Sequence, residues 1–337
     1  MNSKAFLLPA ALMIAGNSVA NSKGKKTDKR PNILVILADD LGYSDLGCYG
    51  SEIHTPNLDK LAQQGVRFNH FYNASRSCPT RASLLTGLYQ HQAGIGRMTF
   101  DDNLPGYRGT LSRNAVTIAE VLKESGYTTS MIGKWHVAET PLRKDQREWL
   151  AHHVYHDTYS DLCHYPVNRG FDSHYGTIYG VVDYFDPFSL VEGEVPVKEV
   201  PEGYYITQAL SDRAAEEVTE YAKDDKPFFM YLAYTAPHWP LHALPEDIEK
   251  YKDTYKVGWE AIRNARYERQ KQLGIFPGMD DFLSERQFKD RWEDNAHAEW
   301  DARAMAVHAA MIDRMDQGIG QAVSYTHLRA HETDSYL

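Results

Sequence analysis

The chain has little cysteine and no excess of positive charge. Its 337 residues include three cysteines, Cys48, Cys78 and Cys163, and no two of them form a C-x-x-C pair. This is too little for a disulfide scaffold and does not support a zinc site built from thiolate pairs, although one disulfide bond could form in an exported chain, leaving one thiol over. The net charge of −10 argues against a nucleic-acid partner, which would require a basic face, but allows a local cationic pocket for an anionic substrate.

Long hydrophobic runs are also missing. Beyond the N-terminus there is no run of about 18 apolar residues, so no membrane span is expected. Residues 1–20 combine Lys4, an apolar segment at 5–16 and small residues up to Ala20, which is typical of a secretory signal peptide. The alternative is a buried N-terminal helix. We therefore expect a periplasmic or secreted protein in which residues 21–30 are a polar linker.

Apolar strands and capped helices alternate along the rest of the chain. The continuous apolar runs at 32–38 and 226–234 are typical of strands buried on both faces of a parallel sheet. This alternation predicts an α/β fold with a mainly parallel central sheet and helices on both faces. Further strands are expected at 66–72 and 128–133, helices at 55–65, 79–87, 117–127, 205–224 and 299–320, and irregular structure at 138–203 and in most of 250–300.

The C-terminal residues 323–337 differ in character from what precedes them. Apolar periodicity holds through Ile319 and then stops without a helix-ending signal in the last turn. We interpret 323–337 as a non-native tail of cloning origin, so that the native domain covers 31–322. The alternative is an ordinary polar C-terminal tail.

Two carboxylates, Asp39 and Asp40, directly follow the first apolar run. Adjacent carboxylates repel each other, so their pairing costs free energy unless a cation neutralises them. Oxygen ligands at a strand end suit Ca²⁺ or Mg²⁺. The alternative is a polar loop in which one carboxylate caps a helix.

The stretch S-C-P-T-R-A-S-L-L-T-G, residues 77–87, places Ser77 beside Cys78. Cysteine is the better nucleophile at neutral pH, and a serine followed by proline is also an ordinary helix cap. The stretch closely resembles the signature of the type I sulfatases: Cys or Ser, any residue, Pro, any residue, Arg, then small residues and Leu ending in Thr-Gly. Counting back from Pro79 puts Ser77 at the first position and Cys78 at the unconstrained one.

The resemblance implies an alkaline-phosphatase-like α/β/α sandwich and conversion of Ser77 to formylglycine, whose hydrated aldehyde attacks sulfur. It implies that Arg81 donates hydrogen bonds to the diol, and that Ser77 joins Asp39 and Asp40 in binding Ca²⁺, with Mg²⁺ as the alternative. A helix N-terminus also favours a bound sulfate. The serine form resembles bacterial sulfatases matured by a radical enzyme, which makes a formylglycine-generating maturase an implied partner.

Two more stretches match the family in the expected order. In G-K-W-H at 133–136, the resemblance implies that Lys134 holds a sulfate oxygen and His136 orients the diol. In A-P-H-W-P-L-H at 236–242, it implies that His238 donates a proton to the leaving oxygen and that His242 contacts substrate. The alternatives are a cation with a packed tryptophan in the first case and structural histidines in the second.

The substrate is left open between an aryl sulfate and a sulfated glycan. The stretch at 169–180 also resembles a family segment near the substrate rim. The histidines of H-H-V-Y-H at 152–156 are interpreted as a solvated loop rather than a transition-metal site. Aromatic side chains available to stack on a sugar or aryl group are Tyr155, Tyr159, Tyr179, Tyr184 and Phe185.

The resemblance covers 31–322 and stops short of a complete site. The family pattern includes an adjacent Asp and Asn, a second catalytic Lys and a C-terminal subdomain that are not found here. We therefore expect this 337-residue chain to be inactive or unstable and a longer parent to be active. The alternatives are a phosphonate or phosphate ester hydrolase of the same superfamily, and a protein that binds sulfated ligands without turnover.

Overall fold

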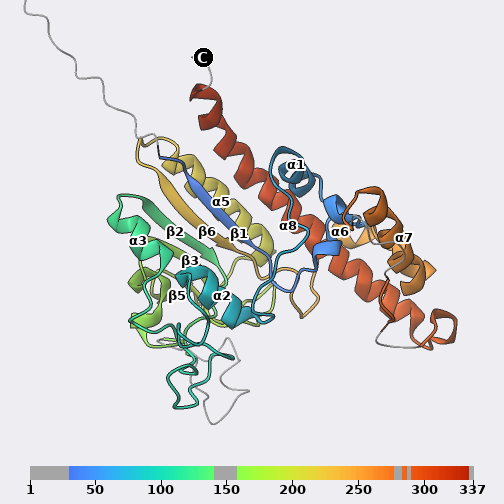
Figure 1. Cartoon of the computed structure of the whole chain (residues 1–337), viewed down its shortest axis with the longest axis horizontal. Helices are drawn as coiled ribbons and strands as arrows, with labels where there is room; N and C mark the ends of the chain where they lie inside the picture. The colour runs from blue at the N-terminus through green and yellow to red at the C-terminus, as the bar shows by residue number, and fades with distance from the viewer. Residues whose placement is uncertain (1–29, 140–157, 277–282, 287–289, 334–337) are drawn as a thin grey trace, which may run out of the picture.

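The structure is a computed structural model that describes residues 30–139, 158–276, 283–286 and 290–333 (Figure 1). The predicted signal peptide and the three histidines at 152–156 lie outside these residues. Tyr155 lies outside them as well.

A six-stranded sheet forms the centre of the fold. Its first four strands in spatial order are parallel, and the last two extend it with antiparallel pairing. The predicted α/β class with a mainly parallel sheet is confirmed. In spatial order the strands are β1 (Ile33–Leu37), β6 (Phe228–Ala233), β2 (Thr128–Gly133), β3 (Ser173–Thr177), β4 (Leu190–Glu192) and β5 (Val195–Pro196).

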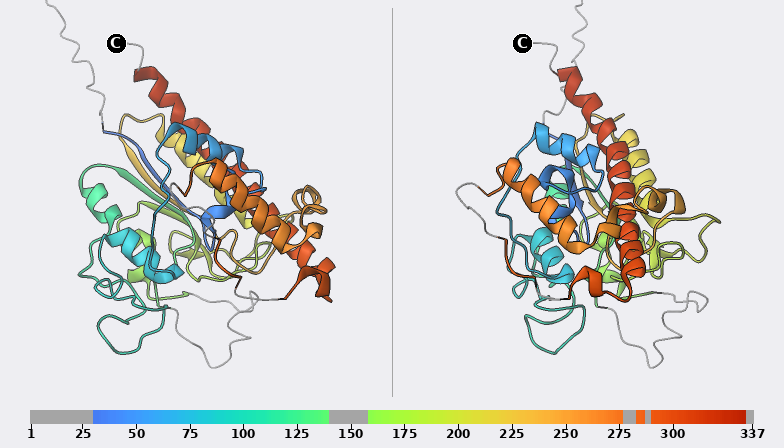
Figure 2. Two further views of the ribbon diagram at one scale, coloured as in Figure 1. Left: turned by 45° about the vertical axis from the view of Figure 1, so that its right-hand side comes forward. Right: turned by 90° about the vertical axis from the view of Figure 1, so that its right-hand side faces the viewer.

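Helices cover both faces of the sheet (Figures 1 and 2). Side chains alternate along β6, so that Met230 and Leu232 pack in one apolar core and Phe229 and Tyr231 in the other. The first core contains residues of α1 (Pro56–Gln64), α5 (Ile206–Tyr221) and α8 (Ala298–Thr333), and the second those of α2 (Ser77–Thr86) and α3 (Ile118–Glu124).

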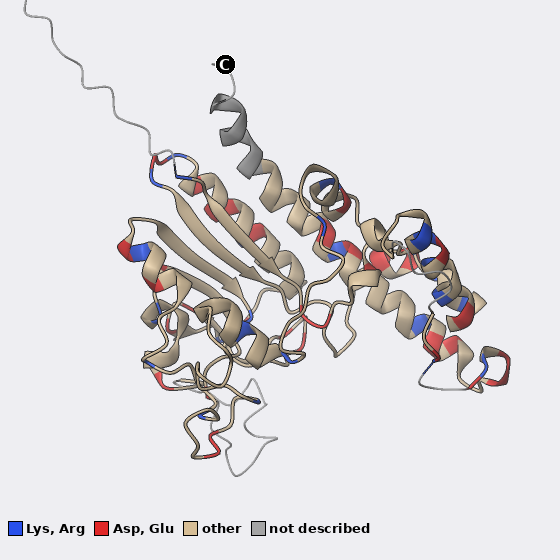
Figure 3. Ribbon diagram, viewed as in Figure 1, with Lys and Arg blue, Asp and Glu red and all other residues tan. Residues whose placement is uncertain are grey.

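The remaining helices are short or lie towards one end of the molecule. Helix α7 was not expected, because its apolar positions are sparse in a charged sequence. Figure 3 shows basic and acidic residues interspersed along the ribbon in this part of the chain. These helices are α6 (Pro245–Glu249), α7 (Trp259–Gln272) and the 3-10 turns η1 (Tyr43–Asp45), η2 (Gly47–Tyr49), η3 (Leu162–His164), η4 (Pro166–Asn168), η5 (Thr254–Val257) and η6 (Trp292–Asp294).

Three expectations about strands differ from the structure. β1 is only half-buried, because β6 is its one partner among the described strands. Residues 66–72 are exposed and irregular, since no strand in the described part of the chain pairs with them and an alternating pattern alone supplies no backbone hydrogen bonds. The segment expected to be irregular at 138–203 contains β3, β4 and β5.

Helix α8 continues through the predicted domain boundary at residue 322 and ends at Thr333. The foreign origin of 323–337 stays a prediction. Across the described ranges, the helices are too short or too polar to cross a bilayer. Cys48, Cys78 and Cys163 are all free thiols, so the disulfide bond that the sequence left open is not formed.

Candidate active site

Seven of the eight predicted site residues lie together at one edge of the sheet. The carboxyl ends of β1, β2 and β6 meet there because these strands are parallel. Asp39 and Asp40 follow β1, Lys134 and His136 follow β2, and His238 follows β6. Ser77 begins α2, and Arg81 lies one turn further along that helix.

Ser77 is in direct contact with two of the predicted residues. Its Oγ lies 3.0 Å from Nε of Arg81 and 3.3 Å from Nδ1 of His136. The neighbouring Cys78 is fully buried, and burial raises the pKa of its thiol to about 11. A buried, protonated thiol is a poor nucleophile, whereas Ser77 is only half-buried. The surroundings therefore favour Ser77 over Cys78.

Arg81, Asp39 and Lys134 form a buried ion cluster. Nη2 of Arg81 lies 3.3 Å from Oδ1 of Asp39, and the Lys134 ammonium pairs with Oδ2 of the same carboxylate. Burial alone raises the pKa of Asp39, but Arg81 and Lys134 outweigh it and the pKa is lowered. Burial also lowers the pKa of Lys134. Nη1 of Arg81 donates to the Lys134 carbonyl at 2.7 Å, and this contact together with the Nη2–Asp39 ion pair fixes the guanidinium.

His136 is held as a neutral imidazole. Burial is the largest cause, and the nearby Lys134 and Arg81 add to it, so the pKa of His136 lies well below its ordinary value. Nε2 of His136 lies 3.3 Å from Sγ of Cys78. The ring packs against Gly180, where an added Cβ would stand 2.0 Å from Cε1 of His136. Gly180 thus leaves the space that the imidazole occupies.

Asp40 and His238 form a second pair at the rim of the cluster. Nε2 of His238 lies 3.4 Å from Oδ2 of Asp40, whose side chain is 59% exposed. Asp40 has φ of 59° and His136 has φ of 52°, a left-handed conformation that non-glycine residues seldom adopt. The Tyr184 hydroxyl donates to the His238 carbonyl at 2.8 Å and so supports this loop.

His242 lies apart from the cluster. Its Nδ1 is 3.6 Å from Oδ2 of Asp183 and 3.4 Å from the backbone nitrogen of Tyr184, and its ring packs on Phe185. No contact to Ser77 is found among the described residues, and substrate contact by His242 stays a prediction.

The predicted aromatic platform is mostly unavailable for stacking. Tyr159 and Tyr184 are buried, and Tyr179 is half-buried with its ring against Phe188. Phe185 packs against Tyr205 and His242 but is 40% exposed, which leaves part of its ring accessible to a ligand. Burial by neighbouring loops could not be inferred from the sequence alone.

Sequence reasoning missed the roles of Gly180, Tyr184 and Tyr231, although it named Tyr184 as a stacking candidate and included Gly180 in the 169–180 stretch. These roles have no local signal, because each residue acts on one distant in the chain. The Tyr231 hydroxyl lies 3.4 Å from Nη1 of Arg81, for example, across 150 positions. A cavity of about 420 Å³ beside α7 and the start of α8 is lined by none of the eight predicted residues.

Comparison with known proteins places the chain in a family. A family model described as Sulfatase matches residues 31–333. The chain belongs to the sulfatase family. It is 34% identical over 327 residues to an arylsulfatase of Klebsiella aerogenes, covering 95% of this chain and 66% of the relative. It is 33% identical over 323 residues to an uncharacterized sulfatase of Schizosaccharomyces pombe, covering 88% of this chain and 54% of that relative.

A solved structure extends the comparison to the fold. The crystal structure of Ps i-CgsB in complex with k-i-k-neocarrahexaose matches with a TM-score of 0.59 and 30% sequence identity, covering 90% of this chain and 56% of that one. The chain thus spans between half and two thirds of the length of these relatives. The family resemblance and the alkaline-phosphatase-like fold expected from the sequence are confirmed.

Proposed function

We propose that the full-length protein hydrolyses sulfate monoesters through a formylglycine made from Ser77. The observation that carries the proposal is the contact of the Ser77 hydroxyl with both Arg81 and His136 at the start of α2. Membership of the sulfatase family supports the reaction class. As formylglycine, residue 77 supplies a hydrated aldehyde whose oxygen attacks sulfur and which releases sulfate by returning to the aldehyde.

A divalent cation fits the donors present. Asp39 and Asp40 carry two negative charges, and Arg81 and Lys134 carry two positive ones, while His136 is neutral. This cluster has no net charge with which to attract a sulfate ester. Ca²⁺, or Mg²⁺ as the alternative, held by Asp39, Asp40 and the oxygen of residue 77 would supply the missing positive charge.

The chain's own residues then have separate roles. Arg81 positions the oxygen of residue 77 through Nε, while its Nη2 pairs with Asp39. The Lys134 ammonium binds a sulfate oxygen, and neutral His136 accepts or donates a hydrogen bond at residue 77 without adding charge. His238 donates a proton to the departing alcohol oxygen, and its Nε2 lies 3.4 Å from Oδ2 of Asp40.

The modification is tested by mass spectrometry of the tryptic peptide that contains position 77, from protein produced in its native host. Conversion of serine to formylglycine removes two hydrogen atoms, and we expect that mass loss on residue 77. The same peptide from a host without a formylglycine-generating enzyme serves as the control. An unmodified serine in an actively desulfating protein would contradict the proposal. The native maturase is proposed to be of the radical type.

For the substrate we propose an aryl sulfate or a sulfated glycan. The relatives support this range, since one is named arylsulfatase and another was solved with k-i-k-neocarrahexaose. Rates with nitrophenyl sulfate and nitrophenyl phosphate distinguish a sulfatase from a phosphate ester hydrolase. Binding of a sulfated sugar without sulfate release would favour the non-catalytic alternative. A periplasmic or secreted location is proposed from residues 1–20, and cell fractionation tests it.

A further inference from the structure

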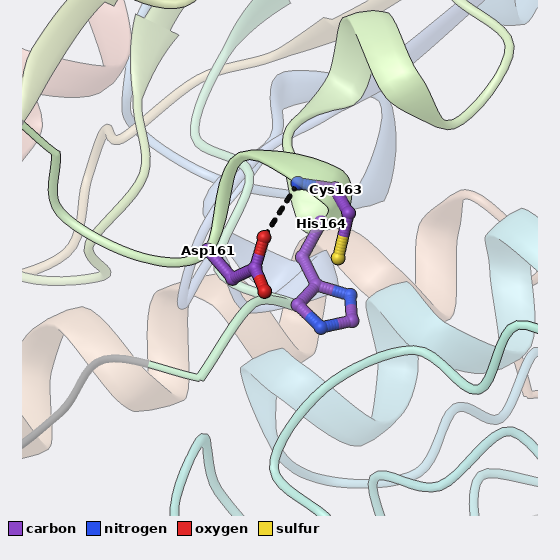
Figure 4. A group of neighbouring side chains, drawn as sticks. All are labelled: Asp161, Cys163 and His164. Carbon is purple, nitrogen blue, oxygen red and sulfur yellow. Dashed lines mark hydrogen bonds between the residues drawn. The ribbon is translucent and has the colours of Figure 1, made fainter.

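A second group of metal-ligating side chains lies outside the candidate active site. Asp161, Cys163 and His164 belong to a single turn, η3 and the residue that caps it. Each offers one ligand atom, and these atoms all lie within 4.8 Å of one another. Figure 4 shows the three side chains gathered on one side of the turn, with a ring nitrogen of His164 towards the Cys163 sulfur.

The local backbone explains this convergence. Asp161 caps the turn, because its Oδ1 accepts a hydrogen bond of 3.0 Å from the backbone nitrogen of Cys163. This bond draws the carboxylate towards Cys163, and the three-residue turn of a 3-10 helix brings His164, three positions after Asp161, to the same side. The turn is also anchored to the segment that follows β2, since Nε1 of Trp135 donates to the His164 carbonyl at 2.8 Å.

An independent observation concerns the imidazole. Nδ1 of His164 is buried and has no hydrogen-bond partner in the described part of the chain. A buried ring nitrogen without a partner costs free energy unless a ligand satisfies it. A metal ion bound between Asp161, Cys163 and His164 would satisfy this nitrogen and neutralise the carboxylate.

We propose that Asp161, Cys163 and His164 form a binding site for Zn²⁺ that is separate from the Asp39–Asp40 cluster. Sulfur, nitrogen and carboxylate oxygen together are ligands that Zn²⁺ accepts, whereas Ca²⁺ and Mg²⁺ avoid thiolate. Three protein ligands leave a fourth position for water. The sequence offered no C-x-x-C pair, so this is a site with one thiolate.

The geometry needs a modest adjustment. Tetrahedral bonds of about 2.0–2.3 Å place ligand atoms roughly 3.5 Å apart, so the side chains must close by about 1 Å. The exposed Asp161 side chain has room for that movement. Arg113 hydrogen-bonds to the Cys163 sulfur, and the ion displaces this contact when it binds.

Cobalt and zinc titrations of the whole 337-residue chain test the site. After removal of metal by a chelator, Co²⁺ is added and the thiolate-to-cobalt charge-transfer absorption is recorded, followed by competition with Zn²⁺. We expect saturable binding of one ion with this absorption, lost on addition of Zn²⁺. Cys163→Ser should abolish the absorption, and His164→Ala and Asp161→Asn should each weaken Zn²⁺ binding at least ten-fold.

Cys48→Ser is the matched control, because it removes another half-buried thiol and should leave the titration unchanged. Circular dichroism of each variant shows whether the fold is retained. Asp161→Asn keeps the oxygen that accepts from the Cys163 nitrogen and so preserves the turn. Absence of the charge-transfer absorption in the folded wild-type chain would overturn the proposal, as would equal Zn²⁺ affinity in Cys163→Ser and Cys48→Ser.

Discussion

The Ser77 hydroxyl lies 3.3 Å from Nδ1 of His136, across 59 positions of the chain. Nε2 of the same ring lies 3.3 Å from Sγ of Cys78. A single neutral imidazole therefore contacts both of the adjacent side chains that compete as candidate nucleophiles. Substitution at each position separates their roles.

Ser77→Ala in the full-length protein should lower kcat/KM for a sulfate ester by at least about 1,000-fold, because the modified side chain is lost. Cys78→Ser should stay within about ten-fold of the wild type, since a hydroxyl keeps a donor for Nε2 of His136. Initial rates with nitrophenyl sulfate measure kcat/KM for both variants. If the Cys78 variant lost as much activity as the Ser77 variant, the assignment of Ser77 would be wrong.

Substitutions of Asp39 and of Asp40 should change the free energy of unfolding by different amounts, although both residues are proposed cation ligands. Asp39→Asn removes the counter-charge of two buried cations and should lower the free energy of unfolding by about 3–5 kcal/mol. Asp40→Asn alters an exposed carboxylate and should cost less than about 1 kcal/mol. Urea unfolding without divalent cations measures the difference. Equal losses would show that the buried ion cluster does not stabilise the fold.

His174 should make the fold sensitive to acid. Burial lowers the pKa of His174 to about 4 from an ordinary 6.5, so the unfolded chain binds its proton first as the pH falls. The contribution of the neutral, buried His174 to the free energy of unfolding is fully present above pH 6.5 and is lost as the pH falls towards about 4. His136, whose pKa is also lowered by burial, acts in the same direction.

His174→Leu should therefore retain about 2 kcal/mol that the wild type loses between roughly pH 7 and pH 5. The free energy of unfolding, measured with urea at both values, tests this. His91→Gln at an exposed position is the control and should follow the wild type. Parallel pH curves for His174→Leu and the wild type would contradict the assignment.

Gly180→Ala should displace the His136 imidazole, since the new methyl group would meet the ring at 2.0 Å. We expect a loss of about 1–3 kcal/mol in unfolding free energy, typical of overpacking, together with reduced turnover in the full-length protein. Gly106→Ala is the control, because the nearest atom there is 3.3 Å away. A fully stable and active Gly180→Ala variant would show that the ring has room to move.

Local signals predicted most elements correctly. Thr117 accepts from the Glu120 nitrogen and Glu120 from the Thr117 nitrogen, and this capping box starts α3 where the sequence placed a helix. The buried strand β6 was predicted from its unbroken apolar run. Such features depend on residues a few positions apart, and the backbone geometry they favour is the same in any fold.

Two predictions were wrong for the same reason: that β1 is buried on both faces, and that residues 66–72 form a strand. A strand is buried or paired only if another segment lies beside it, and the composition of the strand does not say which segment that is. Helix α7 was missed because its charged sequence has only a weak apolar face, which packing against η5 and Trp292 completes.

The sequence by itself determined the fold class, the family and the candidate residues, because spacing within a short stretch specifies which side chains a helix start or strand end presents. Only the tertiary structure decided which of them meet. Ser77 contacts His136 and Arg81 contacts Asp39 because parallel strands bring their carboxyl ends to one edge, while His242 remains with Asp183. Burial, which sets the pKa of His136 and Cys78, likewise follows from packing of segments distant in the chain.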